Sequence, residues 1–156
     1  MIEQLITYLD EKLNHELPGK LAHQEAAPYR KTGFTEGELL NAKESGVLIL
    51  FYIKKNEPHI VLTQRATYNG THSGQISFPG GKREITDRDI IHTALRETNE
   101  EIGVVEADVK VIGQLSQVYI PVSNFRVSPV VGIINYSPQF VLDNYEVDEL
   151  IVLKLS

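Results

Sequence analysis

The sequence predicts an α+β fold built on a mixed β-sheet, and three observations support this class. Short apolar runs separated by turn residues begin after Gly46, one strongly helical stretch spans 89–102, and strands resume after it. Strands, one helix and more strands in this order favour α+β over repeating βαβ units. The chain has 156 residues, the size of a single domain with its own core.

The N-terminal part is expected to form one helix and an irregular arm. Apolar residues recur at helical spacing at Ile2, Leu5, Ile6, Leu9 and Leu13. They predict an amphipathic helix over 1–14, which Pro18-Gly19 stops. Residues 19–46 have little periodicity, and we expect no regular structure there. We expect 1–46, as a helix and arm, to pack on a domain formed by 47–156, giving a single domain overall.

The strands are predicted from short runs rich in β-branched and aromatic residues. Runs 47–53 and 59–65 are joined by the turn-like segment 54–58 and predict an antiparallel hairpin. A third, short strand is expected at 75–78, before Pro79-Gly80-Gly81. Later strands are expected at 109–120, 125–136 and 150–155.

The helix expected over 89–102 carries the acidic residues of interest. Asp87 or Thr86 is the expected N-cap, and Gly103 is placed as a C-terminal glycine. At about 100° per residue, Ile91, Leu95, Thr98 and Ile102 form the face that packs on the sheet. Glu97 and Glu101 project together beside this face, and Glu100 lies one step further round.

Composition excludes several classes of function. The formal net charge of −6 argues against a general polyanion-binding surface, so nucleic acid is not an expected partner. The absence of cysteine excludes disulfides, thiolate zinc sites and a cysteine nucleophile. Any metal must bind oxygen or imidazole.

A cluster of glutamates next to a glycine loop indicates a site for a hard divalent cation. Mg²⁺ and Mn²⁺ prefer oxygen ligands and are often shared with substrate phosphates. Each like-charge pair on a helix costs only about 0.2–0.5 kcal/mol in water, so a solvated acidic face is the alternative interpretation. Six acids and two arginines between Glu84 and Glu101 concentrate the negative charge in this segment.

The same residues resemble the box of the Nudix hydrolases, G-x5-E-x7-R-E-U-x-E-E-x-G-U, where U is aliphatic. The matching segments are 81–87 and 96–104. Thr98 stands at an aliphatic position, Asp87 replaces the first Glu, and eight residues separate Asp87 from Arg96. The resemblance implies an α/β/α sandwich with the catalytic helix after the Gly-Gly loop.

The preceding segment, 62–81, is similar to the coenzyme A pyrophosphatase branch, whose pattern is roughly L-T-x-R-S-x-x-L-R-x-H-x-G-Q-V-x-F-P-G-G. This branch also tends to have Asp in place of the box Glu and the longer gap. The matching residues are Leu62, Thr63, Arg65, His72, Gly74, Gln75, Phe78, Pro79, Gly80 and Gly81. Asn69-Gly70 replaces the usual Leu-Arg. Downstream, 125–132 is also similar to the branch.

The resemblance implies metal-dependent hydrolysis of a diphosphate linkage, with coenzyme A or an acyl-CoA as the first substrate expectation. Glu97 and Glu101 are the expected Mg²⁺ or Mn²⁺ ligands, and Glu100 is a third ligand or the base. The Gly81 carbonyl is expected to complete the coordination, and Arg96 to orient the carboxylates through Asp87 or Glu100. The expected substrate-binding residues are Arg65, Gln75, Gly80 and Gly81.

A base from outside the box stays an open alternative. Glu146, Asp148 and Glu149 precede the last strand, and Glu149 lies where relatives often have a further acid. Two other functions are also open: a pyrophosphatase acting on ADP-ribose or a dinucleotide, and a ligand-binding module without catalysis. A phosphate-binding P-loop is excluded, because Ile76 and Arg83 occupy positions where its pattern requires Gly and Ser or Thr.

Further expectations concern location and assembly. The polar N-terminal segment lacks the features of a signal peptide, and no apolar run approaches the ~20 residues needed to span a bilayer. We expect a soluble, cytoplasmic monomer or homodimer without membrane contact. Relatives usually continue beyond the position of Ser156 into a further helix, so we expect a truncated chain or a short family member.

Overall fold

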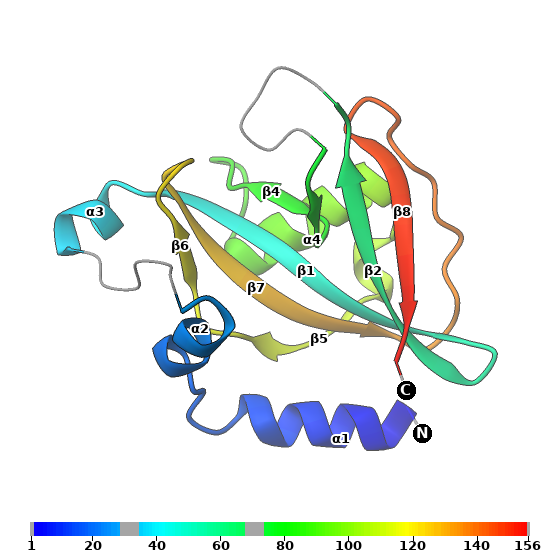
Figure 1. The fold of residues 1–156 in the computed structure, drawn as a ribbon. Helices are drawn as coiled ribbons and strands as arrows, with labels where there is room; N and C mark the ends of the chain where they lie inside the picture. The colour runs from blue at the N-terminus through cyan, green and yellow to red at the C-terminus, as the bar shows by residue number, and fades with distance from the viewer. Residues whose placement is uncertain (1, 29–34, 68–73, 156) are drawn as a thin grey trace.

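The computed structural model describes residues 2–28, 35–67 and 74–155. Its helices and strands form a mixed α+β fold, as predicted (Figure 1). The helices are α1 (Ile2–Leu13), α2 (Lys20–Ala26), α3 (Glu36–Leu40), α4 (Ile90–Ile102) and the short 3-10 helix η1 (Glu106–Asp108). The strands are β1 (Lys43–Lys54), β2 (Glu57–Arg65), β3 (Ile76–Ser77), β4 (Gly80–Lys82), β5 (Lys110–Gln114), β6 (Val118–Ile120), β7 (Phe125–Ile134) and β8 (Val147–Lys154).

Strand β1 is the centre of the sheet. It pairs antiparallel with β2 and β4, and parallel with β7. Strand β8 pairs antiparallel with β2, and both β5 and β6 pair antiparallel with β7. The predicted β1–β2 hairpin is confirmed, and its turn places Lys55 and Asn56 at φ of 52° and 62°. The parallel β1–β7 pair makes the sheet mixed.

One face of the sheet forms the main core with α4. Alternate residues of β1 point toward this helix, and Leu48, Leu50 and Tyr52 are at most 1% exposed. Gly46 lies on the same face, where an added Cβ would be 2.7 Å from the carbonyl oxygen of Ile90. This glycine therefore lets α4 approach the sheet backbone closely.

Helix α1 packs on the opposite face, which completes the sandwich. Gly113 of β5 pairs with Val131 of β7, so both residues face the side away from α4. The Cβ and Cδ1 of Leu13 lie 3.2 Å from the position that a Cβ on Gly113 would take. The predicted amphipathic helix thus docks on the sheet through its apolar side.

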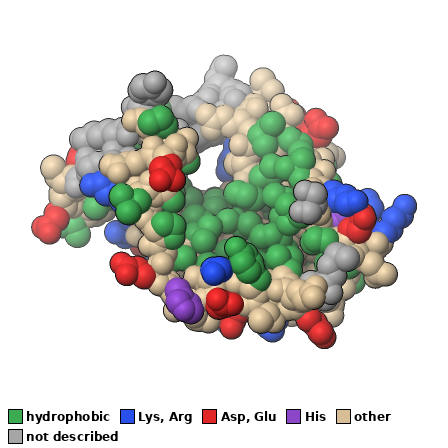
Figure 2. Space-filling view, turned by 60° about the horizontal axis from the view of Figure 1, so that its bottom comes forward, with side chains coloured by type: hydrophobic (Ala, Val, Ile, Leu, Met, Phe, Trp, Pro, Cys, Tyr) green, Lys and Arg blue, Asp and Glu red, His purple; other side chains and the backbone are tan. Residues whose placement is uncertain are grey.

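On this second face, the side chains of β1, β2 and β8 are mostly only partly buried. We call its residues Ile49, Phe51, Ile60, Leu62, Ile151 and Leu153 the front apolar face. Figure 2 shows hydrophobic side chains gathered around a hollow on this side of the molecule, with charged side chains mainly at the rim.

Several predicted boundaries were wrong. Segment 19–46 was expected to lack regular structure, but it contains α2, α3 and the start of β1. The single strand expected over 109–120 is two strands, β5 and β6. They pair with β7 on either side of Pro129, which has no N–H to continue the ladder.

The predicted N-cap of α4 was also wrong. Asp89, rather than Asp87 or Thr86, caps the helix, and its Oδ1 accepts a hydrogen bond from the backbone N–H of His92 at 2.7 Å. The Asp87 side chain is instead engaged with Arg96 and Thr93. The prediction for the other end is confirmed, because Gly103 adopts the left-handed conformation with φ of 73°.

Candidate functional site

The C-terminal turns of α4 place two carboxylates beside strand β4. Glu101 lies next to Gly80, whose backbone N–H donates a hydrogen bond of 3.0 Å to Oε2 of Glu101. Arg65, at the end of β2, donates to the Gly80 carbonyl at 3.1 Å, and its Nη2 lies 3.7 Å from Oε1 of Glu101. The Gly-Gly strand and the end of β2 thus meet around one buried acid.

Glu101 is the most deeply buried of these acids, with a side chain only 2% exposed. Burial raises its pKa to about 7, although the Gly80 N–H and Arg65 favour the ionised form. The neighbouring carboxylates of Glu97 and Glu146 raise the pKa further. A cation next to such a buried carboxylate would stabilise its ionised form.

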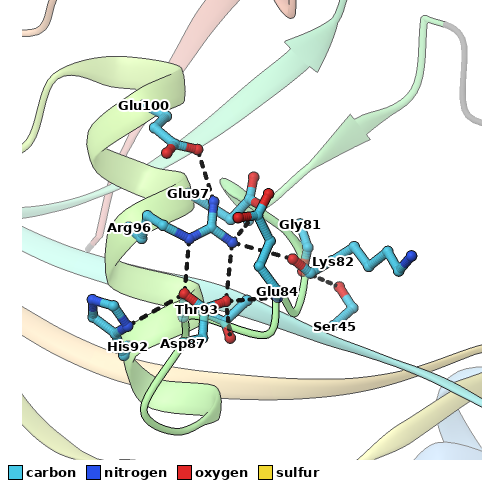
Figure 3. Close-up of polar contacts among 12 residues, drawn as sticks. Ser45, Gly81, Lys82, Glu84, Asp87, His92, Thr93, Arg96, Glu97 and Glu100 are labelled. Carbon is cyan, nitrogen blue, oxygen red and sulfur yellow. Dashed lines mark hydrogen bonds and ion pairs between the residues drawn. The ribbon is translucent and has the colours of Figure 1, made fainter.

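Glu97 lies one helical turn earlier, directly over Gly81. A Cβ on Gly81 would be 2.3 Å from Oε2 of Glu97, so only glycine leaves room for this carboxylate. Burial raises the pKa of Glu97, while Arg96 acts in the opposite direction. Figure 3 shows the Glu97 side chain next to Gly81 and the Arg96 guanidinium.

A third carboxylate comes from Glu146, in the turn before β8. One oxygen from each of Glu97, Glu101 and Glu146 lies within 4.8 Å of the others. Backbone N–H groups of Val141 and Asp143 donate to the carbonyls of Ile102 and Glu101, at 3.0 Å each. These bonds attach the loop that carries Glu146 to the last turn of α4.

Arg96 connects the helix, the loop before it and strand β4 (Figure 3). Its Nε and Nη2 donate to the fully buried Asp87 at 2.9 and 3.1 Å. Nη1 donates to Glu100 at 2.8 Å, while Nη2 also donates to the Lys82 carbonyl at 3.2 Å and lies 3.0 Å from Glu97. Bonding to Arg96 holds the pKa of Asp87 far below its usual range.

The arrangement fits a hard divalent cation. Three carboxylates converge, and two arginines oppose part of their charge, Arg65 at Glu101 and Arg96 at Glu97. Oxygen-only donor sets of this kind suit Mg²⁺ or Mn²⁺. The Gly81 carbonyl, expected as a further ligand, accepts a hydrogen bond of 2.8 Å from Oγ of Ser45.

Comparison with known protein families identifies the domain. Residues 42–148 match the model of the NUDIX domain. This chain belongs to the Nudix family. The matched range includes β4, α4 and the loop that carries Glu146.

Curated Nudix relatives match part of the chain. A protein of Salmonella paratyphi B, named as the uncharacterized Nudix hydrolase NudL, is 44% identical over 97 residues, which are 62% of this chain and 50% of that protein. The NudL of Salmonella newport matches with the same identity and coverage. The aligned chain spans about half the length of these relatives.

Solved structures confirm the Nudix fold. The Caenorhabditis elegans Ap4A hydrolase in a binary complex superposes with a TM-score of 0.59 at 16% identity, covering 72% of this chain and 80% of that one. The NUDIX domain of Shewanella oneidensis NrtR, complexed with ADP ribose, gives a TM-score of 0.59 at 17% identity, covering 85% and 82%. At these identities the likeness concerns the fold alone.

The structure brings together some of the predicted site residues and separates others. Glu97, Glu101, Arg65, Gly80 and Gly81 meet at the carboxylate cluster. Glu100 is half exposed and turned toward Arg96, and it is not one of the three converging acids. Arg96 contacts both of its expected partners, Asp87 and Glu100.

The other predicted positions lie around this centre. The Gln75 carbonyl accepts a hydrogen bond from the Arg65 N–H at 2.9 Å. Glu149 follows Glu146 by three residues, inside β8, and is exposed. Asn69, Gly70 and His72 fall outside the described residues.

Sequence reasoning did not select Glu146 over its acidic neighbours, and it missed Ser45 and Thr93. The Thr93 hydroxyl donates to Oδ2 of Asp87 at 2.9 Å, and Ser45 bonds Gly81. A sequence signal for Thr93 exists. With Asp89 as the N-cap, Thr93 lies in the first turns of α4, three residues before Arg96 and on the side of the helix that faces Asp87. No local signal marks Ser45 or Glu146, because both depend on strand pairing.

Proposed function

We propose that this chain hydrolyses the diphosphate linkage of a nucleoside diphosphate derivative with the help of Mg²⁺ or Mn²⁺. The convergence of Glu97, Glu101 and Glu146 beside Gly80-Gly81 carries this proposal. Membership of the Nudix family supports it, since related proteins are named hydrolases. In the proposed reaction a water gives up a proton to a carboxylate base and its oxygen bonds to one phosphorus. The bond between that phosphorus and the bridging oxygen breaks, and the other phosphate leaves with the bridging oxygen.

Each residue has a defined task in this proposal. Glu97, Glu101 and Glu146 would hold the cation, whose charge would offset that of the diphosphate and lower the pKa of an attacking water. Arg96 keeps Glu97 and Glu100 in position from its anchor on Asp87. Arg65, partly exposed beside Glu101, would bind a substrate phosphate. Glu100, whose side chain is about half exposed, is the box candidate for the base, and Glu149 is the candidate outside the box.

The proposed substrate is coenzyme A or an acyl-CoA, cleaved to adenosine 3',5'-bisphosphate and the corresponding 4'-phosphopantetheine. The similarity of 62–81 to the coenzyme A pyrophosphatase branch supports this choice. ADP-ribose or a dinucleotide is the second candidate, because solved Nudix neighbours carry ADP ribose or are named for Ap4A. The third candidate is a ligand-binding module without catalysis, in which the three converging acids would bind a cation or ligand but support no hydrolysis.

The direct experiment measures hydrolysis of a panel of diphosphates. Coenzyme A, ADP-ribose, NADH and diadenosine polyphosphates are incubated with Mg²⁺ or Mn²⁺, and products are separated chromatographically. Cleavage of one of them supports hydrolysis and identifies the preferred class. If every diphosphate stays intact while the chain is folded, the proposal is wrong.

A pair of variants tests the metal site. Glu101→Gln should lower kcat/KM by about 100-fold or more and weaken Mn²⁺ binding, because one anionic ligand is lost. Glu25→Gln, on the exposed side of α2, is the matched control and should leave both quantities unchanged. An active Glu101→Gln variant would place the metal elsewhere.

A further inference from the structure

Two arginines from different strand segments share one carboxylate near the candidate site. Nη1 of Arg83 lies 2.7 Å from Oε2 of Glu44, and Nη2 of Arg126 lies 2.9 Å from Oε1. Arg83 follows β4, Glu44 is in β1, and Arg126 is in β7. The group carries one net positive charge, although the chain as a whole is acidic.

The pair retains hydrogen-bond donors that the described residues do not use. Nε of Arg126 is buried and has no partner there. The only other buried side-chain atom without a partner among the described residues is Oγ of Ser123, three residues earlier in the β6–β7 hairpin. Buried donors are normally satisfied, so the Arg126 side chain keeps an unused donor next to its ion pair with Glu44.

The arginine pair lies on the same side of the sheet as the carboxylate cluster. In β4 the Gly81 position faces Glu97, and Arg83, two residues later, continues on that face, with its N–H donating to the Glu44 carbonyl at 2.9 Å. Glu44 and Arg126 are register partners in β1 and β7 and face the same way. Two extended residues span about 7 Å, so the Cα of Arg83 lies about 7 Å from that of Gly81, which borders the cluster.

We propose that Arg83 and Arg126 bind a phosphomonoester that the substrate carries in addition to its diphosphate. The inference rests on the proposed function and refines it, since the favoured substrate is then a nucleoside diphosphate derivative with a separate phosphate on the ribose. Guanidinium groups present several N–H donors in a planar fork that matches phosphate oxygens. Glu44 holds the two cations together when no phosphate is bound.

Exposure and charge support this assignment. About a third of each arginine side chain is exposed, 36% for Arg83 and 31% for Arg126, so a ligand can reach both groups. Hydrogen bonds from the two arginines lower the pKa of Glu44, which therefore stays ionised and neutralises one of the two charges. Coenzyme A carries a 3'-phosphate of the required kind, whereas ADP-ribose does not.

The kinetic test compares coenzyme A with 3'-dephospho-coenzyme A. The wild-type chain should prefer coenzyme A by about 10-fold or more in kcat/KM, mainly through KM, as for a charge-assisted hydrogen bond. Arg126→Met should reduce this preference toward unity while kcat/KM for the dephosphorylated substrate stays within about twofold. Arg88→Met removes an exposed arginine from the same loop as Arg83 and should keep the preference.

A binding test does not depend on turnover. By titration calorimetry the wild-type chain should bind adenosine 3',5'-bisphosphate about 10-fold more tightly than 5'-AMP, and Arg126→Met should bind the two alike. Arg126→Lys should restore part of the difference, which a merely structural role would not require. If Arg126→Met does not fold, Arg83→Met serves the same comparison.

The outcomes separate the two proposals. The phosphate site is overturned, even if diphosphates are cleaved, by either of two results. The wild-type chain binds both nucleotides with equal affinity, or Arg126→Met loses the same factor of affinity for both. A clear preference for the bisphosphate, abolished in Arg126→Met, supports the site even if no diphosphate is cleaved and the proposed function fails.

Discussion

Gly81 provides the space in which the Glu97 carboxylate lies, and its replacement gives a direct test of the site. In Gly81→Ala the new Cβ would overlap Oε2 of Glu97 at 2.3 Å and force the carboxylate to move. Because the displaced atoms end a side chain, the free energy of unfolding should change by less than about 1 kcal/mol. A shift of about 1 Å at a metal ligand should lower kcat by about 100-fold.

The measurement is kcat with Mg²⁺ beside a urea unfolding curve. Gly37→Ala is the matched control, because nothing lies within 4 Å of its added Cβ. Full activity of Gly81→Ala would show that Glu97 does not need its present position.

Glu101 should make the stability of the metal-free chain depend on pH. Its pKa is raised to about 7, above the value in an unfolded chain, so its contribution is fully present below about pH 4.5 and is lost as pH rises through 7. A difference of about 2.5 pKa units corresponds to about 3 kcal/mol of unfolding free energy. Asp87, with a lowered pKa, acts oppositely and weakens the fold only in more acidic solution.

Urea unfolding in EDTA at pH 5.5, 7 and 8.5 measures this dependence. The free energy of unfolding should fall over this range in wild type and much less in Glu101→Gln. Equal slopes for the two proteins would contradict the assignment of the raised pKa to Glu101.

At the scale of single elements, α4 was the most predictable part. The spacing of Ile91, Leu95 and Ile102 and the position of Gly103 all agree on one helix, because these signals are local. Its N-cap was misplaced because Asp87 and Asp89 look equivalent in sequence, and only the fold shows that Asp87 is engaged by Arg96. Helix α3 was missed although Thr35 and Glu38 form a capping box, since five residues show no apolar period.

The capping of α4 can be tested with Asp89→Ala. Loss of the 2.7 Å bond to the His92 N–H should reduce the free energy of unfolding by about 1 kcal/mol. Asp89→Asn keeps an acceptor and should lose only a small part of this. Urea unfolding of both variants decides, and identical destabilisation by the two would mean that charge at the helix start, rather than capping, matters.

At the scale of the whole molecule, the order of strands could not be predicted from the sequence. The parallel pairing of β1 with β7 and the position of Glu146 beside Glu101 join segments far apart in the chain, and no local pattern encodes such pairings. The helical period did predict that Glu97 and Glu101 project together, because they are four residues apart on one helix. No helix in residues 2–28, 35–67 and 74–155 is long and apolar enough to cross a membrane.

The second layer of the sandwich can be tested at Leu13. Its half-buried side chain lies against Gly113, and Leu13→Ala should reduce the free energy of unfolding by about 1–2 kcal/mol. Gln4→Ala, on the exposed side of α1, should have almost no effect. A thermal unfolding scan compares them, and equal stability of the two variants would mean that α1 is not docked in solution.

The two backbone bonds from Val141 and Asp143 to the end of α4 also affect how the molecule opens locally. These amides lie in an irregular segment, yet both are hydrogen-bonded to carbonyls of the last turn of α4. In deuterium exchange they should therefore be protected like helical amides and exchange together with those of Ile102 and Gly103. The loop and the helix end would then behave as one cooperative unit, in which Glu101 and Glu146 keep their mutual position through ordinary thermal fluctuations.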